Sequence, residues 1–385
     1  MAPITPYSGT NGTSHTTNGT TPSINGNKPI ILYLGDPILY NRDLYSHLQS
    51  KFTIIPTDIS DRHRDQFIQH LKDQKWGNFS AIMRPFWNTG NEMHRWDREL
   101  IQLLPPSMKV MASAGAGFDW VDTEALGEQG ILYTNGAGAS TESVADMALY
   151  LIIDVFRRMT WSSQAARSGI VSDFQKAHQK VMFKSHNPRG HALGIVGLGN
   201  IGFAIAKKVR AACGMQILYY DISRKPSIQE QEVDATFYSS LEELLGHSDC
   251  VLLASPGGST ILNAQTIPHL KHGARVVNIA RGSLIDEDAL ADALDSGRVS
   301  AAGLDVHSNE PNTNPRLRDR WNVASSCHTG GSSEETIIGF ERLVIQNVEA
   351  VLEGREPLTA VNKQHLRVNE RDGGTNGHTY DDLEH

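Results

Sequence analysis

The stretch GIVGLGNIGFAIAKKV, residues 194–209, contains the pattern Gly197-x-Gly199-x-x-Gly202. An apolar run precedes the pattern and residues with helical spacing follow it, so we predict that it joins a strand to a helix. Glycines there permit a tight turn and let backbone N–H groups approach a pyrophosphate, whose charge a helix N-terminus favours. An ordinary glycine-rich turn can show the same pattern, so its context has to decide.

The next apolar run, QILYYD, ends at Asp221, 19 positions after Gly202. A carboxylate at this spacing is typical of a dinucleotide site, where it accepts hydrogen bonds from the adenosine ribose. It also repels the 2′-phosphate of NADP, so we predict NAD as the cofactor. Arg224 and Lys225 follow closely and would favour a phosphate, which leaves NADP open as an alternative.

Short apolar runs alternate with helical stretches on both sides of this motif. One series begins near residue 28, and a second runs from HALGIVGLG (191–199) to about residue 328. This alternation is typical of parallel sheets with helices on both faces, and 385 residues exceed what one hydrophobic core usually serves. We therefore predict an α/β fold of two Rossmann-like, doubly wound parallel-sheet domains with a cleft between them.

The same patterns suggest the domain limits. We expect a substrate (catalytic) domain from residues 29–150 plus 330–362, because an amphipathic helix predicted over 334–354 would return to the first series. Residues 151–329 would form the NAD-binding Rossmann domain, with an irregular stretch at 162–190. The polar residues 1–28 are expected to be a disordered tail, and residues 363–385 a flexible one.

Composition argues against several classes of protein. The 35 Lys and Arg against 43 Asp and Glu give a net charge of −8, which disfavours a nucleic acid or an anionic membrane as partner. The three cysteines, Cys213, Cys250 and Cys327, show neither a disulfide framework nor metal-ligand spacing. No apolar run is long enough to span a membrane, and no signal peptide is evident. We expect a cytoplasmic protein without a metal.

Three further segments place polar residues directly after strand-like runs. VVNIARGSLIDEDAL (276–290) presents Arg281, and AAGLDVHSNEP (301–311) presents Asp305, His307 and Glu310. SSCHTGGSS (325–333) presents His328. Because open α/β sheets bind ligands at the carboxyl ends of their strands, we expect these side chains to meet. Each also has a structural alternative, such as a surface ion pair for Arg281 or a turn residue for Glu310.

VGLGNIG, VNIARGSLIDEDAL, AGLDVHSNEP and a histidine before a Gly-rich turn, in this order, resemble the D-isomer-specific 2-hydroxyacid dehydrogenases. The resemblance covers about residues 30–362. Within the family, LGDP, AGAGFDW, DMALYLI, HNPRGHALG and GLDVH are most similar to the fungal D-mandelate dehydrogenase branch. It implies an NAD-dependent oxidoreductase that acts on the CH–OH group of 2-hydroxy acids. It also implies a homodimer formed through the cofactor domain, with an arm at 161–190.

The family's catalytic residues fall on Arg281, Glu310 and His328. An imidazole titrates near neutral pH, so His328 can donate a proton to the keto oxygen while nicotinamide gives the hydride. Glu310 beside it would favour the protonated ring and orient it. Arg281 can grip the substrate carboxylate and polarise the carbonyl.

The resemblance also implies the ligand contacts. Backbone N–H groups of the loop SAGAGFD (113–119) would bind the substrate carboxylate through Gly115, Ala116 and Gly117, together with Arg281 and His328. Two departures from the family stand out: Ser255-Pro256-Gly257-Gly258 replaces a common Pro-Leu-Thr, and Cys327 replaces a common proline. The expected cofactor contacts are Gly197, Gly199, Asn200, Ile201, Gly202, Asp221, Ser255, Ile279, Ala280, Asp305, Gly330 and Gly331.

Aromatic residues in MRPFWNTGNEMHRW (83–96), with Phe118 and Trp120, suggest a pocket for a bulky side chain on the 2-keto acid. Met83, Phe86 and Trp87 are the candidates to line it, although the same residues would also suit a core. Benzoylformate, phenylpyruvate and branched aliphatic acids fit such a pocket. Glyoxylate and hydroxypyruvate are the less favoured alternative.

Other functions remain open from the residues alone. The family includes NAD-sensing corepressors that keep the acid/base residues, so a binding role is a second hypothesis. Formate dehydrogenases pair the histidine with glutamine, and Glu310 argues against them. A Cys327–His328 nucleophile pair is disfavoured because adjacent side chains project differently.

Overall fold

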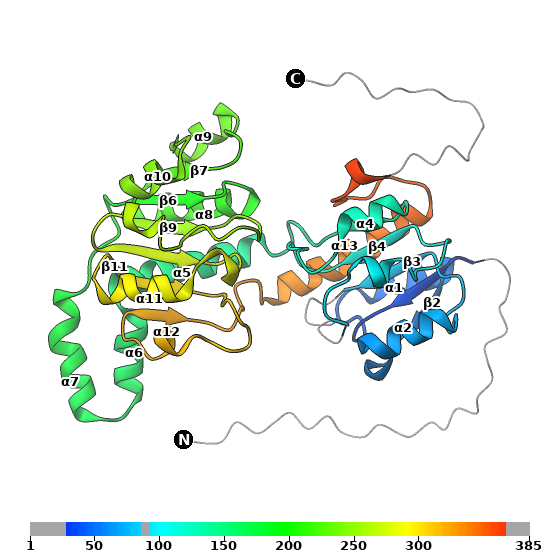
Figure 1. The fold of residues 1–385 in the computed structure, drawn as a ribbon, viewed down its shortest axis with the longest axis horizontal. Coiled ribbons are helices and arrows are strands. Elements are labelled where there is room, and N and C mark those ends of the chain that lie inside the picture. The colour runs from blue at the N-terminus through cyan, green and yellow to red at the C-terminus, as the bar shows by residue number, and fades with distance from the viewer. Residues whose placement is uncertain (1–27, 86–92, 367–385) are drawn as a thin grey trace.

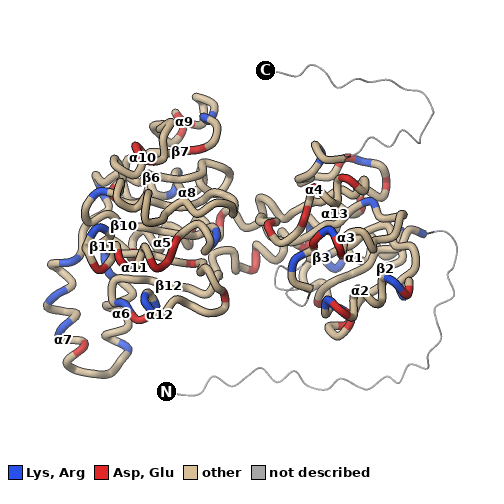
Figure 2. Tube along the Cα trace, in the orientation of Figure 1, with Lys and Arg blue, Asp and Glu red and all other residues tan. Residues whose placement is uncertain are grey.

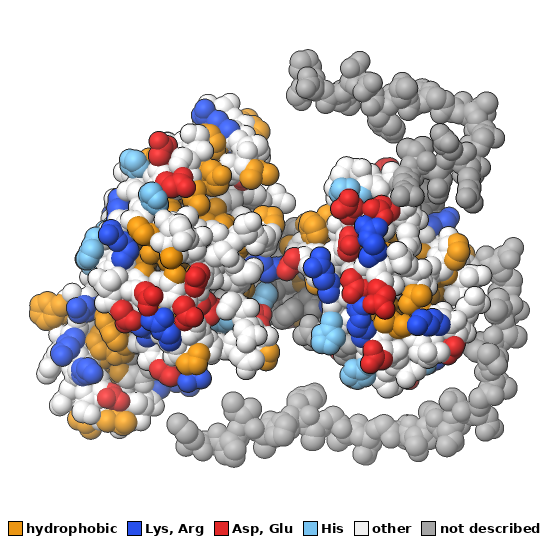
Figure 3. All heavy atoms as spheres, in the orientation of Figure 1, with side chains coloured by type: hydrophobic (Ala, Val, Ile, Leu, Met, Phe, Trp, Pro, Cys, Tyr) orange, Lys and Arg blue, Asp and Glu red, His pale blue; other side chains and the backbone are white. Residues whose placement is uncertain are grey.

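The computed structural model describes residues 28–85 and 93–366, which form two lobes joined at a narrow waist (Figures 1 and 3). Acidic and basic residues are interspersed along the chain in both lobes (Figure 2). None of the helices in these two ranges is long and apolar enough to cross a membrane. Phe86 and Trp87 lie outside the described residues, as do residues 1–27 and 367–385.

The first lobe contains a five-stranded parallel sheet in the order β2-β1-β3-β4-β5. Its short strands consist of apolar residues that are mostly buried, as expected for a sheet covered on both faces. The elements are β1 (Ile30–Tyr33), α1 (Arg42–Lys51), β2 (Thr53–Pro56), η1 (Ile59–Arg62), α2 (Arg64–Lys72), β3 (Ala81–Arg84), α3 (Arg98–Ile101), β4 (Val110–Ser113), α4 (Thr123–Glu128) and β5 (Leu132–Thr134).

The last long helix, α13 (Glu334–Leu352), returns to this lobe and packs on β3 and β4. Its Glu341 is fully buried and accepts hydrogen bonds from the backbone N–H groups of Leu39, Tyr40 and Asn41. A chain segment some 300 positions away therefore completes the first lobe.

The second lobe contains a seven-stranded parallel sheet in the order β12-β11-β10-β9-β6-β7-β8. The strand order changes direction between β6 and β9, and such a switch point opens a crevice at the carboxyl ends of the strands. The strands are β6 (Ala192–Val196), β7 (Gln216–Tyr220), β8 (Ala235–Phe237), β9 (Cys250–Leu253), β10 (Ala274–Asn278), β11 (Val299–Leu304) and β12 (Val323–Ser325).

Helices cover both faces of this sheet. Apolar residues of α5 and α8 form one buried cluster with β6, β7 and β9, and residues of α10 and α11 form a second on the other side. The predicted doubly wound architecture is therefore confirmed in both lobes. The helices are α5 (Thr141–Arg157), α8 (Asn200–Cys213), α9 (Ser227–Val233), α10 (Leu241–His247), η4 (Ile267–His269), η5 (Gly282–Leu284), α11 (Glu287–Asp295) and α12 (Pro315–Arg318).

Helix α5 crosses the boundary that we predicted near residue 150. Its contacts are with α8, β10 and β11, so residues 141–150 lie with the seven-stranded sheet. We propose that the NAD-binding domain begins before Thr141. The connecting segments meet where Ser143 Oγ lies 2.7 Å from Ser333 Oγ.

Two local predictions differ from the structure. The stretch 162–190 is not irregular: α6 (Met159–Arg167), α7 (Val171–Lys180) and η3 (Val181–Phe183) make it mostly helical. Residues 363–365 were predicted to belong to a flexible tail, but they form η6 (Lys363–His365), which packs on α4. Asn362 holds it there by donating to the carbonyl oxygens of Thr123 and Ile131 and accepting from Tyr133 N.

Candidate active site

The glycine pattern lies where the sequence predicts it, between β6 and α8. Gly197 has a φ of +97°, which a side chain would strain, and its Cα faces the backbone of Ser255. A Cβ on Gly202 would lie 2.2 Å from Gly197 O, so α8 can approach the turn only with glycine there. Nothing lies within 4 Å of a Cβ built on Gly199, which leaves room in front of the helix N-terminus. This open N-terminus fits the pyrophosphate of a dinucleotide.

The other predicted cofactor residues surround this turn. Asn200 and Ile201 open α8, and the partly buried Ile201 side chain packs against the core of the second lobe. Asp221 follows β7; its Oδ2 accepts from Leu198 N at 2.9 Å and lies 3.0 Å from Lys225 Nζ. The Ser255 hydroxyl is buried and has no hydrogen-bond partner among the described residues, as suits a group that contacts a ligand.

Arg281 follows β10, after the buried Ile279 and Ala280. Its Nη1 donates to Ala280 O at 2.7 Å, and the Arg281 carbonyl accepts from Asn278 Nδ2 at 2.8 Å. These local bonds fix the backbone from which the guanidinium projects across the waist toward the first lobe.

In the first lobe, Asp119 pairs with the guanidinium: Arg281 Nε donates to Asp119 Oδ1 at 3.0 Å. A Cβ on Gly117 would lie only 1.4 Å from Arg281 Nη2, so the arginine lies directly on the Gly117 backbone. The structure therefore brings the predicted catalytic arginine together with the predicted substrate loop. Sequence reasoning missed Asp119, although it stands in the loop quoted for its glycines.

The substrate loop itself is braced by Asn135, a second residue that sequence reasoning missed. Asn135 Nδ2 donates to Ala116 O at 2.8 Å, and Gly136 N donates to Gly115 O at 2.7 Å. Both contacts are between segments that follow neighbouring strands, β4 and β5. They hold the backbone of Gly115 to Gly117 in place beside Arg281.

His328 and Glu310 are in contact, with His328 Nδ1 2.9 Å from Glu310 Oε2. Glu310 Oε1 accepts from the backbone N–H of His307, also at 2.9 Å. Partial burial by itself would raise the pKa of Glu310, but the hydrogen bonds from His328 and His307 outweigh burial and lower it. Glu310 is therefore ionised at neutral pH and can orient the imidazole ring.

Asp305 is buried among hydrogen-bond donors. It is 2% exposed, and its carboxylate accepts from Ser326 Oγ and from the backbone N–H groups of Thr329 and Gly330, all at 2.8–2.9 Å. His328 N donates to the Asp305 carbonyl at 2.7 Å. These partners make Asp305 the anchor of the histidine loop, and its contact with the cofactor stays a prediction.

Gly330 and Gly331 follow the histidine and face the start of α5. A Cβ on Gly330 would lie 2.6 Å from Asp305 Oδ2, and one on Gly331 would lie 3.5 Å from Ser140 Cβ. They therefore let the loop lie against α5 and Asp305. Neighbouring Cys327 is an exposed free thiol.

Only some residues of the predicted aromatic pocket lie in the described part of the chain. Met83 is fully buried in the core of the first lobe, so its prediction as a lining residue is wrong. The Trp120 ring stacks on the Arg84 guanidinium at 4.4 Å, and Phe118 packs near Tyr133. Phe86 and Trp87 cannot be placed, as they lie outside the described residues.

The chain is similar to known proteins of one family. Residues 149–330 match the family model described as D-isomer specific 2-hydroxyacid dehydrogenase, NAD binding domain. A 4-methyl-2-oxopentanoate reductase A from Aspergillus oryzae is 34% identical over 86% of this chain and 98% of its own. This chain belongs to the D-isomer-specific 2-hydroxyacid dehydrogenase family.

Solved structures of the family extend the likeness to the fold. The holo crystal structure of Rhodotorula graminis D-mandelate dehydrogenase is 40% identical, with a TM-score of 0.85 over 87% of this chain and 98% of its own. A Paecilomyces thermophila glyoxylate reductase is 33% identical, with a TM-score of 0.80 over 88% and 99%. The predicted resemblance is confirmed, and the chain is an NAD-dependent oxidoreductase of this family.

Proposed function

We propose that this dehydrogenase interconverts a bulky 2-keto acid and its D-2-hydroxy acid, using NAD(H). The 2.9 Å contact between His328 and Glu310 carries the proposal, because it joins a proton donor to the carboxylate that orients it. Relatives named for mandelate and for 4-methyl-2-oxopentanoate support a bulky substrate. Relatives named glyoxylate reductase support the alternative of a small one.

NADH, when bound, supplies the hydride that reaches the keto carbon. His328 Nδ1 is engaged by Glu310, so we assign the other ring nitrogen, Nε2, to the proton that the keto oxygen takes up. The new C–H and O–H bonds make the alcohol, and the ring is left neutral. In the oxidation of the hydroxy acid the same nitrogen takes the proton back.

Arg281 has two roles in this proposal. Its guanidinium lies on the loop whose N–H groups would bind the substrate carboxylate, so it can bind that carboxylate and polarise the keto oxygen together. Asp119 holds the guanidinium in this place through Nε. The carboxylate, the arginine and the histidine then orient the keto carbon for reduction.

The test is a panel of benzoylformate, phenylpyruvate, 4-methyl-2-oxopentanoate, glyoxylate and hydroxypyruvate, each with NADH and with NADPH. We expect the highest kcat/KM with a bulky acid and NADH, and a D-configured product. Faster turnover of glyoxylate would establish the small-acid alternative. Binding of NADH without turnover of any acid would favour a corepressor-like role.

A pair of variants tests the role of the histidine. His328→Asn should lower kcat by at least about 10²-fold, the contribution of a well-placed general acid, while NADH still binds. His247→Asn, a change at an exposed histidine of α10, should leave kcat unchanged. Retained activity in His328→Asn would refute the assignment.

We further propose a homodimer formed through the arm 161–190. Ile170, Val171, Phe174 and Phe183 are 54%, 70%, 55% and 77% exposed there, and such an apolar cluster is typical of a protein–protein contact. Light scattering should give a mass of two chains for the parent protein and of one chain for the double variant Phe174→Glu, Phe183→Glu. The control Ile59→Glu, at an exposed isoleucine of the first lobe, should keep the mass of two chains.

We also propose a cytoplasmic location. Cys213, Cys250 and Cys327 are all free thiols, as a reducing compartment would leave them. The distribution of a fluorescent fusion between cell fractions tests this, and enrichment in a secretory compartment would refute it.

A further inference from the structure

A hollow of about 380 Å³ lies beside the nucleotide turn. Besides the turn itself, it is lined by Ser223, Arg224 and Lys225, which follow β7. A hydroxyl, a guanidinium and an ammonium are the donors that bind a phosphate monoester in proteins. The residues needed to hold a ribose 2′-phosphate are thus present next to Asp221, the residue that should disfavour one.

Both cations of this hollow are already held by carboxylates. Arg224 donates from Nε and Nη2 to the two oxygens of Glu230, each at 2.9 Å, which is a bidentate pair. Lys225 Nζ lies 3.0 Å from Asp221 Oδ2. A 2′-phosphate would therefore meet two carboxylates together with two cations whose charge those carboxylates offset.

Glu230 is fixed more firmly than a surface carboxylate. Its side chain is 10% exposed, and it also accepts from Tyr219 Oη at 2.7 Å. Tyr219 is fully buried in β7, and its own oxygen accepts from Lys225 N at 2.9 Å. The hydrogen bonds from Arg224 and Tyr219 lower the pKa of Glu230 to about 2, so it keeps its charge throughout the physiological range.

We propose that Glu230 is a specificity-determining residue: it pairs with the Arg224 guanidinium and offsets its charge, and thereby favours NAD(H) over NADP(H). The proposal rests on the proposed function only in taking NAD(H) as the cofactor. Arg224 lines the hollow and is 65% exposed, so its guanidinium becomes available to a phosphate there once the carboxylate no longer holds it. Asp221 and Glu230 then act together, the first by repulsion and the second by occupying the arginine.

The test compares adenosine 2′,5′-bisphosphate with 5′-AMP by isothermal titration calorimetry on the full chain. In Glu230→Gln, the dissociation constant of the bisphosphate should fall about tenfold, equivalent to about 1.4 kcal/mol, while that of 5′-AMP stays the same. Adding Arg224→Ala to Glu230→Gln should abolish the gain. An unchanged dissociation constant in folded Glu230→Gln would overturn the proposal.

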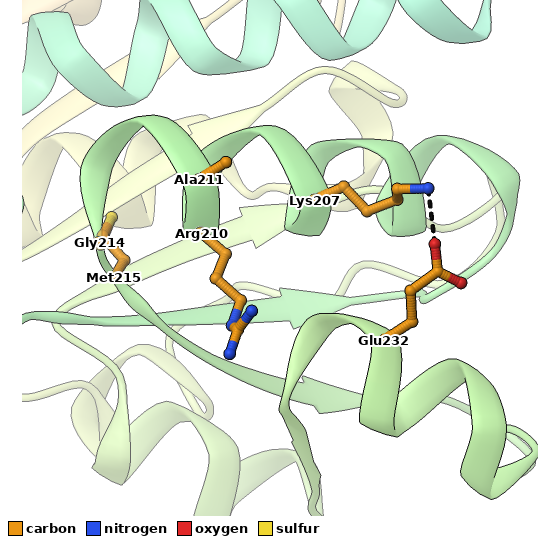
Figure 4. Close-up of a pocket in the computed structure, with 6 residues that line it drawn as sticks. All are labelled: Lys207, Arg210, Ala211, Gly214, Met215 and Glu232. Atoms are coloured by element: carbon orange, nitrogen blue, oxygen red, sulfur yellow. Dashed lines mark hydrogen bonds and ion pairs between the residues drawn. The ribbon is translucent and has the colours of Figure 1, made fainter.

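Glu232 provides the matched control. It lies on the same helix α9 and pairs with Lys207 of α8 at 2.6 Å, on the side of a separate hollow (Figure 4). Glu232→Gln removes the same charge but leaves Arg224 paired with Glu230, so it should not change the binding of either nucleotide. An equal gain in affinity for the bisphosphate in Glu232→Gln would mean that the change in overall charge causes the effect, and it would also overturn the proposal.

The test separates this inference from the proposed function. These nucleotides carry no nicotinamide, so their binding does not depend on turnover of any 2-keto acid. Failure of every acid to react, with the tenfold gain still present, would refute the proposed reaction alone. If Glu230→Gln does not fold, Tyr219→Phe removes one hydrogen bond of Glu230, and a smaller gain of the same sign is expected from it.

Discussion

Gly117→Ala is the most direct test of how Arg281 is placed. The backbone of Gly117 is not in the left-handed region, so its conformation allows alanine, and the three atoms nearest to the new Cβ all belong to the arginine. The new Cβ would lie 1.4 Å from Arg281 Nη2, whereas real Cβ contacts are essentially never below 3.0 Å. The guanidinium must therefore move by about 1.6 Å, which would break its 3.0 Å bond to Asp119.

A displacement of about 1 Å in a substrate-positioning group costs on the order of 10²-fold in rate, so kcat/KM of Gly117→Ala should fall by about this factor. The end of an arginine side chain can move without disturbing the core, so the free energy of unfolding should change by less than about 1 kcal/mol. Steady-state oxidation of NADH with benzoylformate and a denaturant melt measure the two effects separately.

Gly246→Ala is the matched control, because a Cβ there meets only His269 O at an ordinary 3.7 Å. It should leave kcat/KM unchanged. A folded Gly117→Ala enzyme within about threefold of the parent kcat/KM would refute the reasoning, since Arg281 could not then lie on Gly117 in the productive complex.

Three further predictions concern the histidine loop. Asp305→Asn should lower both the melting temperature and kcat/KM, because one of the two acceptor oxygens that hold the histidine loop is replaced by an amide nitrogen, and leaving a donor such as the buried Gly330 N unsatisfied costs about 1–3 kcal/mol; equal values in both assays would contradict this. Glu310 has a lowered pKa, so the stability that it adds over Glu310→Gln should be lost as pH falls below its ordinary value of about 4.3; a difference in melting temperature that already disappears well above that pH as the solution is acidified would argue against the lowered pKa. Cys327→Ala should keep kcat and KM, since the thiol is exposed; loss of activity in the folded variant would give Cys327 a role.

Much of the fold could be predicted because its signals are local. A period of two or a run of apolar residues marks a strand, and the spacing of 3.6 marks a helix, so α8, α13 and the strands β6, β7, β10 and β11 lie where the sequence predicts them. The strands β5, β8 and β12 were missed because three residues are too few to show a period. The helices α6 and α7 were missed because many of their apolar residues are exposed, which blurs the amphipathic pattern.

The candidate site divides in the same way. The glycine turn and the residues after β7, β10 and β11 follow from short motifs, since each motif carries its own strand, turn and helix. Asp119 and Asn135 could not be assigned from the sequence, because their partners follow other strands. The role of the Asp305 carboxylate in holding the histidine loop could not be assigned from the sequence either, because its partners, Thr329 N and Gly330 N, lie more than 20 positions away.

The sequence by itself therefore determined the family, the two doubly wound sheets and the residue types available for hydride-coupled proton transfer. The tertiary structure decided which side chains pair: Arg281 lies on Gly117 and pairs with Asp119, 162 positions away, and Glu230 forms an ion pair with Arg224. The physical reason is that secondary structure depends on neighbours along the chain. The partners of a charged side chain depend on how elements distant in the chain are packed, and only the folded molecule specifies that.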